Sequence, residues 1–315
     1  MTCRKLVRAL VAVGSLAWMT GPLSGLDETW FVENSLGMKI AKEPLSSPRE
    51  VPANAATTTP LRFAAWPTRV RDFDAFVAAT HYDATADMLS LGRDGWNARG
   101  ASWRHPGFSQ GSDHPVVGVS YGDALAFCEW LTKREREQGR IGLNECYRLP
   151  TDEEWQRLVS SVTPWPNSKY LWGNHWPPAP YEGNFAGEEV LESPHWPEGW
   201  DCIRATRDDF AGTSPVTWEG GNYRGFHDLT GNVWQWTSTP FRRELNRDEI
   251  RESYRFLDRD SDDTGKPSKV IRAGCWNDYL PGLLELNTRG AREPHNRNAG
   301  LGFRIVLAPG DVPEN

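Results

Sequence analysis

The sequence lacks several motifs by which common enzyme classes are identified. It contains no glycine-rich nucleotide-binding loop and no zinc-protease signature. Its seven histidines include no H-x3-H pair, so the two-histidine, one-carboxylate set of a non-haem iron site is not indicated. It also has no internal repeat and no low-complexity run that would divide it, so we expect one folded domain.

The sequence has no apolar run in its N-terminal region that is long enough to span a bilayer comfortably. The apolar segment Ala9–Met19 is short, follows three basic residues and precedes Ser24 and Gly25, which is the pattern of a secretory signal. We expect a signal peptide at 1–25, a linker at 26–33, a domain at 34–310 and a tail at 311–315. The protein would then be exported, periplasmic or secreted, without a stable membrane span after cleavage. The alternatives are a poorly ordered cytosolic N-terminus and an uncleaved anchor.

Acidic residues outnumber basic ones, 42 to 35, and cysteine is scarce. The formal charge is −7, and loss of Arg4, Lys5 and Arg8 with the signal would bring it to −10, which argues against nucleic acid as a partner. Cys3 precedes the apolar segment, so it is not a lipoprotein cysteine. The four others allow three disulfide pairings, among which the sequence does not choose, and buried free thiols are the alternative.

Tryptophan, glycine and proline are abundant. The chain has 16 Trp, 29 Gly and 23 Pro, with 38% hydrophobic and 24% charged residues. This balance is typical of a folded globular chain, and large aromatic side chains stabilise a core that has little regular secondary structure. Frequent glycine and proline favour many turns and short strands. Composition alone therefore indicates a loop-rich protein of mixed α and β structure.

Three helices are predicted from capping residues and apolar spacing. The first begins near Thr68, which can cap it, and the second begins after Ser120, with Cys128 on its core-facing side. The third begins at Thr151, where Glu154 completes a capping box.

Strands and loops are less regular. We predict short strands at Pro115–Val119, Val270–Arg272 and Gly302–Leu307, and a loop at Pro44–Pro60. Residues 164–224 are predicted as long ordered loops, which in a compact domain are usually functional or held by ions.

Five sequence stretches carry a family resemblance. They are NSLGMKI from Asn34, YRLPTDEEW from Tyr147, GFHDLTGNVWQW from Gly225, VIRAGCWND from Val270, and GLGFRIVL ending at Leu307. Together they resemble the sulfatase-modifying-factor family, whose best-known members are the formylglycine-generating enzymes. The resemblance implies an α+β, C-type-lectin-like, loop-rich single domain with a small antiparallel sheet.

The resemblance also implies calcium. The first site would use the side-chain oxygens of Asn184 and Asp208 and the carbonyls of Phe185 and Phe210. The second would use Asp228, the carbonyls of Gly231 and Val233, and Gln235, where the family usually has glutamate. Oxygen-rich turns suit this hard cation, and the alternative is that these groups only hydrogen-bond within turns.

Copper, by contrast, is not expected. The resemblance places the two copper-binding cysteines of the oxidases at Asp278 and at Leu283, or at Leu284 with a one-residue gap. Soft Cu(I) prefers thiolates, which these residues do not supply. Cys275 replaces a family serine, and it is either a reactive thiol or a small buried residue.

The segment from residue 276 to residue 297 is predicted to be a ligand-binding face. Its candidate residues are Trp276, Asn277, Asp278, Asn287, Arg289, Arg292, His295, Asn296 and Arg297. Arginine, tryptophan and asparagine suit recognition of a protein, peptide or glycan. The alternative is that the arginines form internal ion pairs and the asparagines cap turns.

These features lead to one functional hypothesis and two alternatives. The first is an exported, non-oxidase member of the family that binds a ligand or protein. The second is a divergent formylglycine-generating oxidase or another oxidative modifier, which would need a second cysteine, such as Cys202, beside Cys275. The third is an accessory subunit of an envelope complex with an exposed tryptophan patch.

Overall fold

The structure is a computed structural model, and it describes residues 30–42, 61–86, 88–165, 167–241 and 267–310. The expected signal peptide, the tail 311–315 and the predicted loop Pro44–Pro60 lie outside the described residues. The expected linker is described only in part. Its residues Phe31–Glu33 form strand β1, which pairs with β2 (Lys39–Ala41) in an antiparallel ladder.

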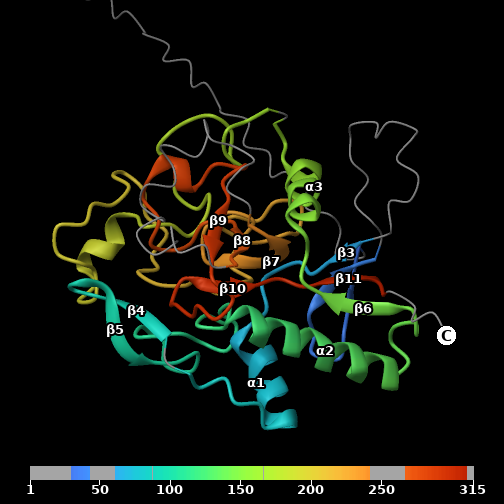
Figure 1. Ribbon diagram of the computed structural model, residues 1–315. Helices are drawn as coiled ribbons and strands as arrows, with labels where there is room; N and C mark the ends of the chain where they lie inside the picture. The colour runs from blue at the N-terminus through green and yellow to red at the C-terminus, as the bar shows by residue number, and fades with distance from the viewer. Residues whose placement is uncertain (1–29, 43–60, 87, 166, 242–266, 311–315) are drawn as a thin grey trace, which may run out of the picture.

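A four-stranded sheet lies at the centre of the fold, in the order β10-β7-β8-β9 (Figure 1). Its strands are β7 (Trp234–Pro240), β8 (Lys269–Arg272), β9 (Gly290–Arg292) and β10 (Leu301–Phe303). The expectation of an antiparallel sheet is wrong for one pair, because β10 runs parallel to β7. Both β9 and β10 run in the direction of β7, so the crossing loop at 293–300 has to return from the C-terminal end of β9 to the N-terminal end of β10 at the other edge of the sheet.

The predicted strand Gly302–Leu307 is divided between two sheets. Its first part belongs to β10, and its last part begins β11 (Val306–Pro309). Strand β11 is the middle strand of a three-stranded antiparallel sheet, between β3 (Arg62–Phe63) and β6 (Glu145–Arg148). The predicted strand Val270–Arg272 is confirmed within β8. A separate hairpin is formed by β4 (Met88–Gly92) and β5 (Gly95–Ala101).

Local capping predicts two of the three helices correctly. Helix α2 (Tyr121–Glu137) is capped by Ser120, whose Oγ accepts the N–H of Asp123 at 3.1 Å. Helix α3 (Asp152–Val162) is capped by Thr151 in the same way, with Glu154 as its partner. In Figure 1, α1 and α2 lie on one side of the central sheet and α3 on the other.

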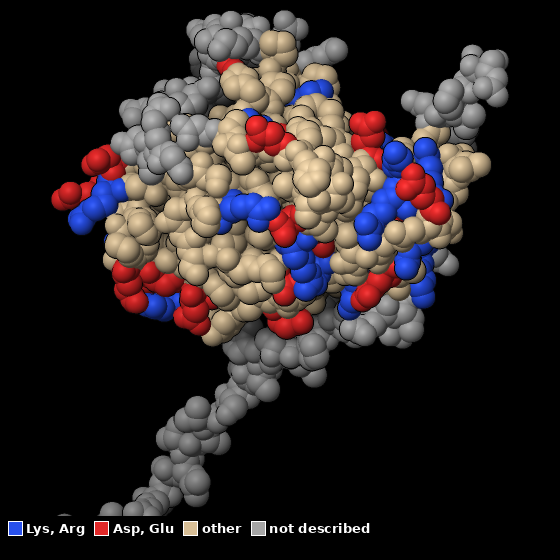
Figure 2. Space-filling model, turned by 90° about the horizontal axis from the view of Figure 1, so that it is seen from below, with Lys and Arg blue, Asp and Glu red and all other residues tan. Residues whose placement is uncertain are grey.

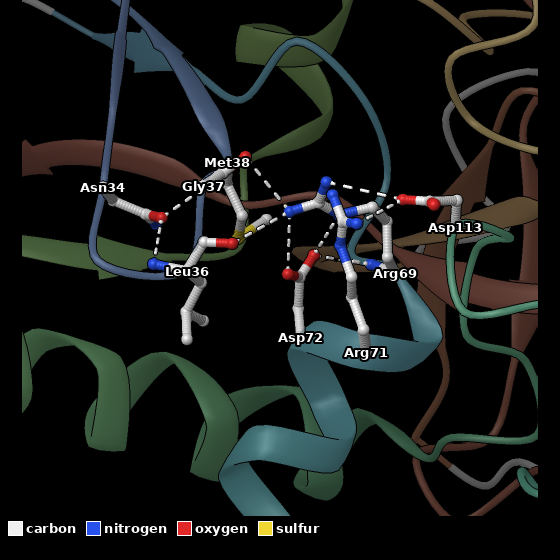
Figure 3. Close-up of polar contacts among 8 residues, drawn as sticks. All are labelled: Asn34, Leu36, Gly37, Met38, Arg69, Arg71, Asp72 and Asp113. Carbon is white, nitrogen blue, oxygen red and sulfur yellow. Dashed lines mark hydrogen bonds and ion pairs between the residues drawn. The ribbon is translucent and has the colours of Figure 1, made fainter.

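The first helix begins near Thr68, as predicted, but with a different N-cap. Helix α1 (Val70–Thr80) has Arg69 rather than Thr68 at its N-cap, and Asp72 accepts the backbone N–H of Arg69 at 3.0 Å. Figure 3 shows how Arg69 also clamps the N-terminal turn, because its guanidinium donates to the carbonyls of Leu36 and Gly37 at 3.1 Å. The start of α1 is therefore fixed by a tertiary contact as well as by its own sequence.

The predicted strand Pro115–Val119 is not formed. Only Pro115 makes a bridge, to Arg69. The N–H of Val116 donates to Thr68, and that of Gly118 donates to the carbonyls of Asn298 and Leu301. The segment is extended but ties together loops from both halves of the chain instead of pairing with one strand.

The core is built mainly from aromatic side chains. Phe73 of α1 contacts the rings of Phe76, Trp103, Phe127 and Phe303, and these rings are almost completely buried. Cys128 on α2 is also buried, as its helical position predicts. The described residues of the segment 164–224, which are all but residue 166, form loops, as predicted, apart from a short 3-10 helix η2 (Glu188–Glu192).

Charged side chains are mixed on the face that Figure 2 shows, where Lys and Arg lie beside Asp and Glu in small groups. Among the described residues, the structure contains no helix that is both long and apolar enough to cross a membrane.

A candidate ligand cavity beside Cys275

A small cavity of about 60 Å³ lies between the central sheet and the β4–β5 hairpin. Its polar lining consists of Cys275, Asn277, Asp278, Arg292, Asn296 and Asn298. Its apolar lining includes Trp234 from the sheet and Leu89 and Trp96 from the hairpin. The structure therefore brings together five of the predicted site residues, including Cys275, and adds Asn298 and Trp96, which the sequence did not indicate.

A sharp turn after β8 positions Cys275. Ala273 and Gly274 both have positive φ, 94° and 76°. A Cβ on Gly274 would lie 2.9 Å from the side chain of Leu284, so glycine is required here for space as well as for conformation. The turn lets the backbone N–H of Cys275 donate to Asp278 Oδ2 at 2.8 Å, while the thiol contacts Asn277 Oδ1 at 2.8 Å.

Burial controls the charge states in the cavity. It raises the pKa of Asp278 to about 7, against hydrogen bonds from Cys275 and the nearby Arg292 charge, which lower it. Burial and the neighbouring Asp278 raise the pKa of the Cys275 thiol well above its usual value. Cys275 is therefore protonated at neutral pH, and a protonated thiol is a weak nucleophile and a poor metal ligand.

Arg297 holds the cavity wall in place. Its guanidinium forms two hydrogen bonds of 2.9 Å with Asp123, in the first turn of α2. Its carbonyl accepts the N–H of Leu89, and the N–H of Ala299 donates to the carbonyl of Leu89, both at 3.0 Å. The hairpin and the crossing loop 293–300 are thus fixed to one another and to a helix.

Three residues of the predicted binding face have structural roles, and a fourth lies outside the cavity. Trp276 is only 3% exposed, and its indole N–H donates to the carbonyl of Ala299 at 2.9 Å, so it belongs to the core. Arg289 pairs with Asp152 at 2.8 Å, and Arg297 pairs with Asp123, as the alternative of internal ion pairs proposed. Asn287 is exposed but does not line the cavity.

His295 is exposed as well and pairs with Glu293 at 3.1 Å. Four of the predicted face residues line the cavity, whereas Asn287 and His295 are exposed outside it. The sequence of this segment does not distinguish surface side chains from core side chains, because it has no regular period from which burial can be predicted.

The first predicted calcium set is partly engaged by the backbone. Both carboxylate oxygens of Asp208 accept backbone N–H groups, from Phe185 at 2.8 Å and from Phe210 at 2.9 Å. Burial and the nearby Glu189 carboxylate raise the pKa of Asp208 to about 8. No described residue hydrogen-bonds to the buried oxygens Asn184 Oδ1 and Glu189 Oε1. Two buried carboxylates beside an unsatisfied amide oxygen suit a hard cation, so this set fits calcium.

Glu189 was not among the predicted residues. It follows Glu188 directly, and the sequence does not distinguish the two. Their difference arises in η2, where Glu189 is buried and Glu188 accepts the N–H of Ala205.

The second predicted calcium set fits a cation less well. Gln235 Oε1 accepts a hydrogen bond from the buried guanidinium of Arg304 at 3.1 Å, and Gln235 Nε2 donates to the carbonyl of Asp228 at 2.7 Å. The carbonyl of Gly231 accepts the N–H of Val233 at 2.8 Å. Arg304 therefore already supplies positive charge beside Asp228, although no described residue hydrogen-bonds to the buried Asp228 Oδ2.

The two positions of the family's copper-binding cysteines have different surroundings. Asp278 lines the cavity, whereas Leu283 and Leu284 are buried, Leu284 within an apolar cluster with Trp172 and Phe185. Cys275 is a free thiol and is the only cysteine of the cavity lining. The requirement of the oxidase hypothesis, a second cysteine in the cavity, is not met within the described residues.

One further motif has a structural role. Gly118–Gly122 reads GVSYG, which matches the G-x-S-x-G pattern of hydrolase nucleophiles. Ser120 is the N-cap of α2, and its Oγ accepts the N–H of Asp123. Ser120 is also buried, with only 5% of its surface exposed, so its role is to cap the helix.

The fold and the motif-bearing turns define a formylglycine-generating-enzyme-like domain. Residues 33–309 match the sulfatase-modifying factor enzyme 1-like domain, and the chain belongs to that family. It is 26% identical to the inactive C-alpha-formylglycine-generating enzyme 2 of Bos taurus, over 84% of this chain and 82% of that protein. It is 24% identical to the formylglycine-generating enzyme of Thermomonospora curvata, over 82% and 86%.

Among solved structures, the chain is similar to PvdO from Pseudomonas aeruginosa. The TM-score is 0.56 at 18% identity, over 88% of this chain and 97% of that one. At this identity the similarity establishes the fold alone.

Proposed function

We propose that this chain is a non-oxidase member of its family, which binds a protein or peptide through the Cys275–Asp278 cavity. One observation carries the proposal. Where the oxidases hold Cu(I) between two cysteines, this chain has Asp278, which is tied to the backbone of Cys275, and the buried Leu283. Neither residue supplies a thiolate, which Cu(I) requires.

The size and lining of the cavity support a binding role. A volume of about 60 Å³ suits one short side chain or a similar polar group, rather than a whole small molecule. Asn277, Asn296 and Asn298 supply a polar wall, in which the Asn298 amide donates to Asn296 Oδ1 at 2.9 Å and the Cys275 thiol contacts Asn277 Oδ1, and Arg292 supplies a cation. The similarity to a relative named as inactive is consistent with this role. A glycan is the alternative ligand.

Export and calcium belong to the same proposal. The basic and apolar N-terminal pattern supports export to the periplasm or the medium. The buried Asn184 and Asp208 set, with Glu189, supports one calcium ion that would stabilise the loops at 184–212.

The proposal is tested with a labelled Cys-x-Pro-x-Arg peptide, the substrate type of the oxidases. Peptide binding is measured by fluorescence anisotropy, and peptide conversion in Cu(I) and oxygen by mass spectrometry, with an active family member as positive control. We expect binding without a formylglycine product. Asn296→Ala, which removes a cavity amide, should weaken binding about tenfold or more. Asn287→Ala, at an exposed position outside the cavity, is the matched control and should change nothing.

Formation of formylglycine that is lost in Cys275→Ser would establish the oxidase alternative instead, with a one-thiol centre. Equal binding by the two asparagine variants, or failure to bind both the peptide and an oligosaccharide panel, would contradict the assignment of the ligand to this cavity.

A further inference from the structure

A second and larger cavity, of about 570 Å³, lies apart from the Cys275 cavity. Its walls come from residues within 108–114, 189–195 and 207–213. The ring centroids of Phe108, in this lining, and Trp276 are 5.1 Å apart, while the two chain neighbours of Trp276 line the smaller cavity. Trp276 therefore separates the two cavities. The volume of the larger one is sufficient for a whole small molecule.

The largest apolar groups of this lining are the phenyl rings of Phe108 and Phe210. Each is held by a tryptophan outside the lining, Phe108 by Trp276 and Phe210 by Trp218, with ring centroids 5.3 Å apart in the second pair. A Cβ on Gly212 would lie 2.8 Å from the Phe108 ring, so glycine at 212 leaves this ring room beside the 207–213 wall. Both phenyl rings are half-buried, so part of each is open to a ligand.

His114 supplies a neutral polar group to the cavity. Its Nδ1 lies 3.0 Å from Thr213 Oγ1, which also accepts a hydrogen bond from Gln110 Nε2 at 3.0 Å. Burial lowers the pKa of His114, so the imidazole is neutral at neutral pH. Its Nε2 has no hydrogen-bond partner among the described residues, so this atom can bond to a ligand, as a donor or as an acceptor according to the tautomer.

The charged groups of the lining are already engaged. On the exposed rim, Arg207 pairs with Glu192 at 3.0 Å and lies 4.0 Å from Asp209. Glu189 is only 5% exposed, and its Oε2 accepts the N–H of Asp208 at 3.3 Å. Among the described lining residues, no carboxylate or guanidinium is therefore both unpaired and open to a ligand. The cavity suits a ligand without net charge.

Aromatic rings beside neutral and paired polar groups match the two surfaces of a pyranose sugar. The flat face of a pyranose carries C–H groups, which pack on the negative face of an aromatic ring. Its hydroxyls both donate and accept hydrogen bonds, so they can satisfy an imidazole nitrogen and a rim ion pair. A wholly apolar ligand would take water from these polar groups without replacing its hydrogen bonds.

We propose that this cavity binds a neutral saccharide built from pyranose rings. Phe108 and Phe210 contact the sugar faces. His114 Nε2 bonds to a hydroxyl inside the cavity, and the Arg207–Glu192 pair bonds to hydroxyls at the rim. The proposal uses no residue of the Cys275 cavity, so it stands or fails independently of the proposed function.

The test uses cellobiose and N,N′-diacetylchitobiose as probes, titrated into the full chain and followed by calorimetry and ligand-observed NMR. Sorbitol, an acyclic polyol with hydroxyls but no pyranose face, is the control ligand. The buffer contains calcium, because the 207–213 wall includes Asp208 and Phe210 of the first predicted calcium set. We expect at least one disaccharide to bind at least about fivefold more tightly than sorbitol.

Two variants test the residues assigned to the sugar. Phe210→Leu, which keeps an apolar side chain but removes the ring, should weaken disaccharide binding about fivefold. Arg207→Ala, at the exposed rim, should also weaken it, and it tests the site even where Phe210→Leu perturbs the fold. The matched control is Arg204→Ala, which breaks an equally exposed type of ion pair outside the cavity and should leave binding unchanged.

Equal affinity for sorbitol and the disaccharides would overturn the proposal, as would absence of disaccharide binding at millimolar concentration. Binding that Phe210→Leu and Arg207→Ala both leave unchanged would also overturn it. If Asn296→Ala weakens disaccharide binding and the two variants do not, the sugar belongs to the Cys275 cavity instead.

Discussion

Asp278 and Cys275 form two hydrogen bonds with each other across one turn. The carboxylate of Asp278 accepts the N–H of Cys275 at 2.8 Å, and the N–H of Asp278 donates to the carbonyl of Cys275 at 3.0 Å. The position that carries a copper ligand in the oxidases thus holds a carboxyl group that stabilises the backbone beneath the cavity. The same residue makes the cavity sensitive to pH.

The first prediction concerns that sensitivity. Asp278 has a pKa of about 7 in the fold and an ordinary value of 3.8, so the folded chain retains a proton that the unfolded chain loses. Its stabilising contribution is present below pH 4 and is lost as the pH rises through about 7, with a slope of at most about 1.4 kcal/mol per pH unit. Asp208 and Asp228, whose pKa values are about 8 and about 7, act in the same direction.

Urea denaturation across this pH range should therefore show stability that falls with pH, and Asp278→Asn should fall less steeply. The matched control is Asp201→Asn, a change at an exposed carboxylate outside the cavity, and its slope should equal that of the wild type. A wild-type stability that rises between about pH 4 and about pH 7 would contradict the charge state assigned to these carboxyls.

The second prediction separates core from contact surface. Trp276 is 3% exposed and Trp165 is 49% exposed. Trp276→Ala should lower the free energy of unfolding by about 3–5 kcal/mol, because it removes a large buried side chain and leaves a cavity. Trp165→Ala should change it by about 0.5 kcal/mol or less. Chemical denaturation measures both, and a Trp276→Ala protein as stable as the wild type would show that this ring is not part of the core.

The third prediction concerns the clamp between Arg297 and Asp123. The two side chains are 15% and 2% exposed. Arg297→Ala should lower the free energy of unfolding by about 3 kcal/mol, because it leaves the buried Asp123 without a cation and releases the loop at 293–300. Arg204→Ala breaks a pair in which both side chains are 65% exposed, and it should cost less than about 1 kcal/mol. Equal losses of unfolding free energy in Arg297→Ala and Arg204→Ala would contradict the difference expected between a buried and an exposed ion pair.

The fourth prediction distinguishes the two calcium sets. Calcium should raise the free energy of unfolding of the wild type, by about 2.7 kcal/mol at a hundredfold excess over the dissociation constant. Asp208→Asn should abolish this response. Gln235→Ala should keep it while lowering stability with and without calcium, because Gln235 joins Arg304 to the carbonyl of Asp228. A calcium response that is lost in Gln235→Ala but kept in Asp208→Asn would assign the ion to the second set.

The fifth prediction concerns thiol reactivity. Burial and Asp278 keep Cys275 protonated, and Cys128 is buried with a pKa raised in the same way. Iodoacetamide at neutral pH should therefore label Cys146, which is only partly buried, before either of them in the native protein. All should react in denaturant, which peptide mass spectrometry can follow. Rapid labelling of Cys275 in the native protein would instead support the alternative that Cys275 is a reactive thiol.

Local sequence was sufficient wherever one short segment makes its own contacts. Ser120 and Thr151 cap their helices through residues three positions away, so the capping pattern predicts both starts. The family motifs likewise identify the fold, because they mark turns such as Gly274, where only glycine has room.

Tertiary structure alone decided what the predicted site residues do. Arg297 meets Asp123 across 174 positions and Arg304 meets Gln235 across 69, so neither could be assigned to an ion pair or to a ligand from its neighbours in sequence. Strand β10 pairs in parallel with β7, and the loop that leads into it packs Ala299 against Trp276. The same loop places Asn296 and Asn298 beside Cys275. The sequence determined which chemical groups this protein has and the local turns that carry them. Long-range packing determined which of them are buried, paired or open to a ligand, because burial and charge pairing depend on neighbours that only the folded chain brings together.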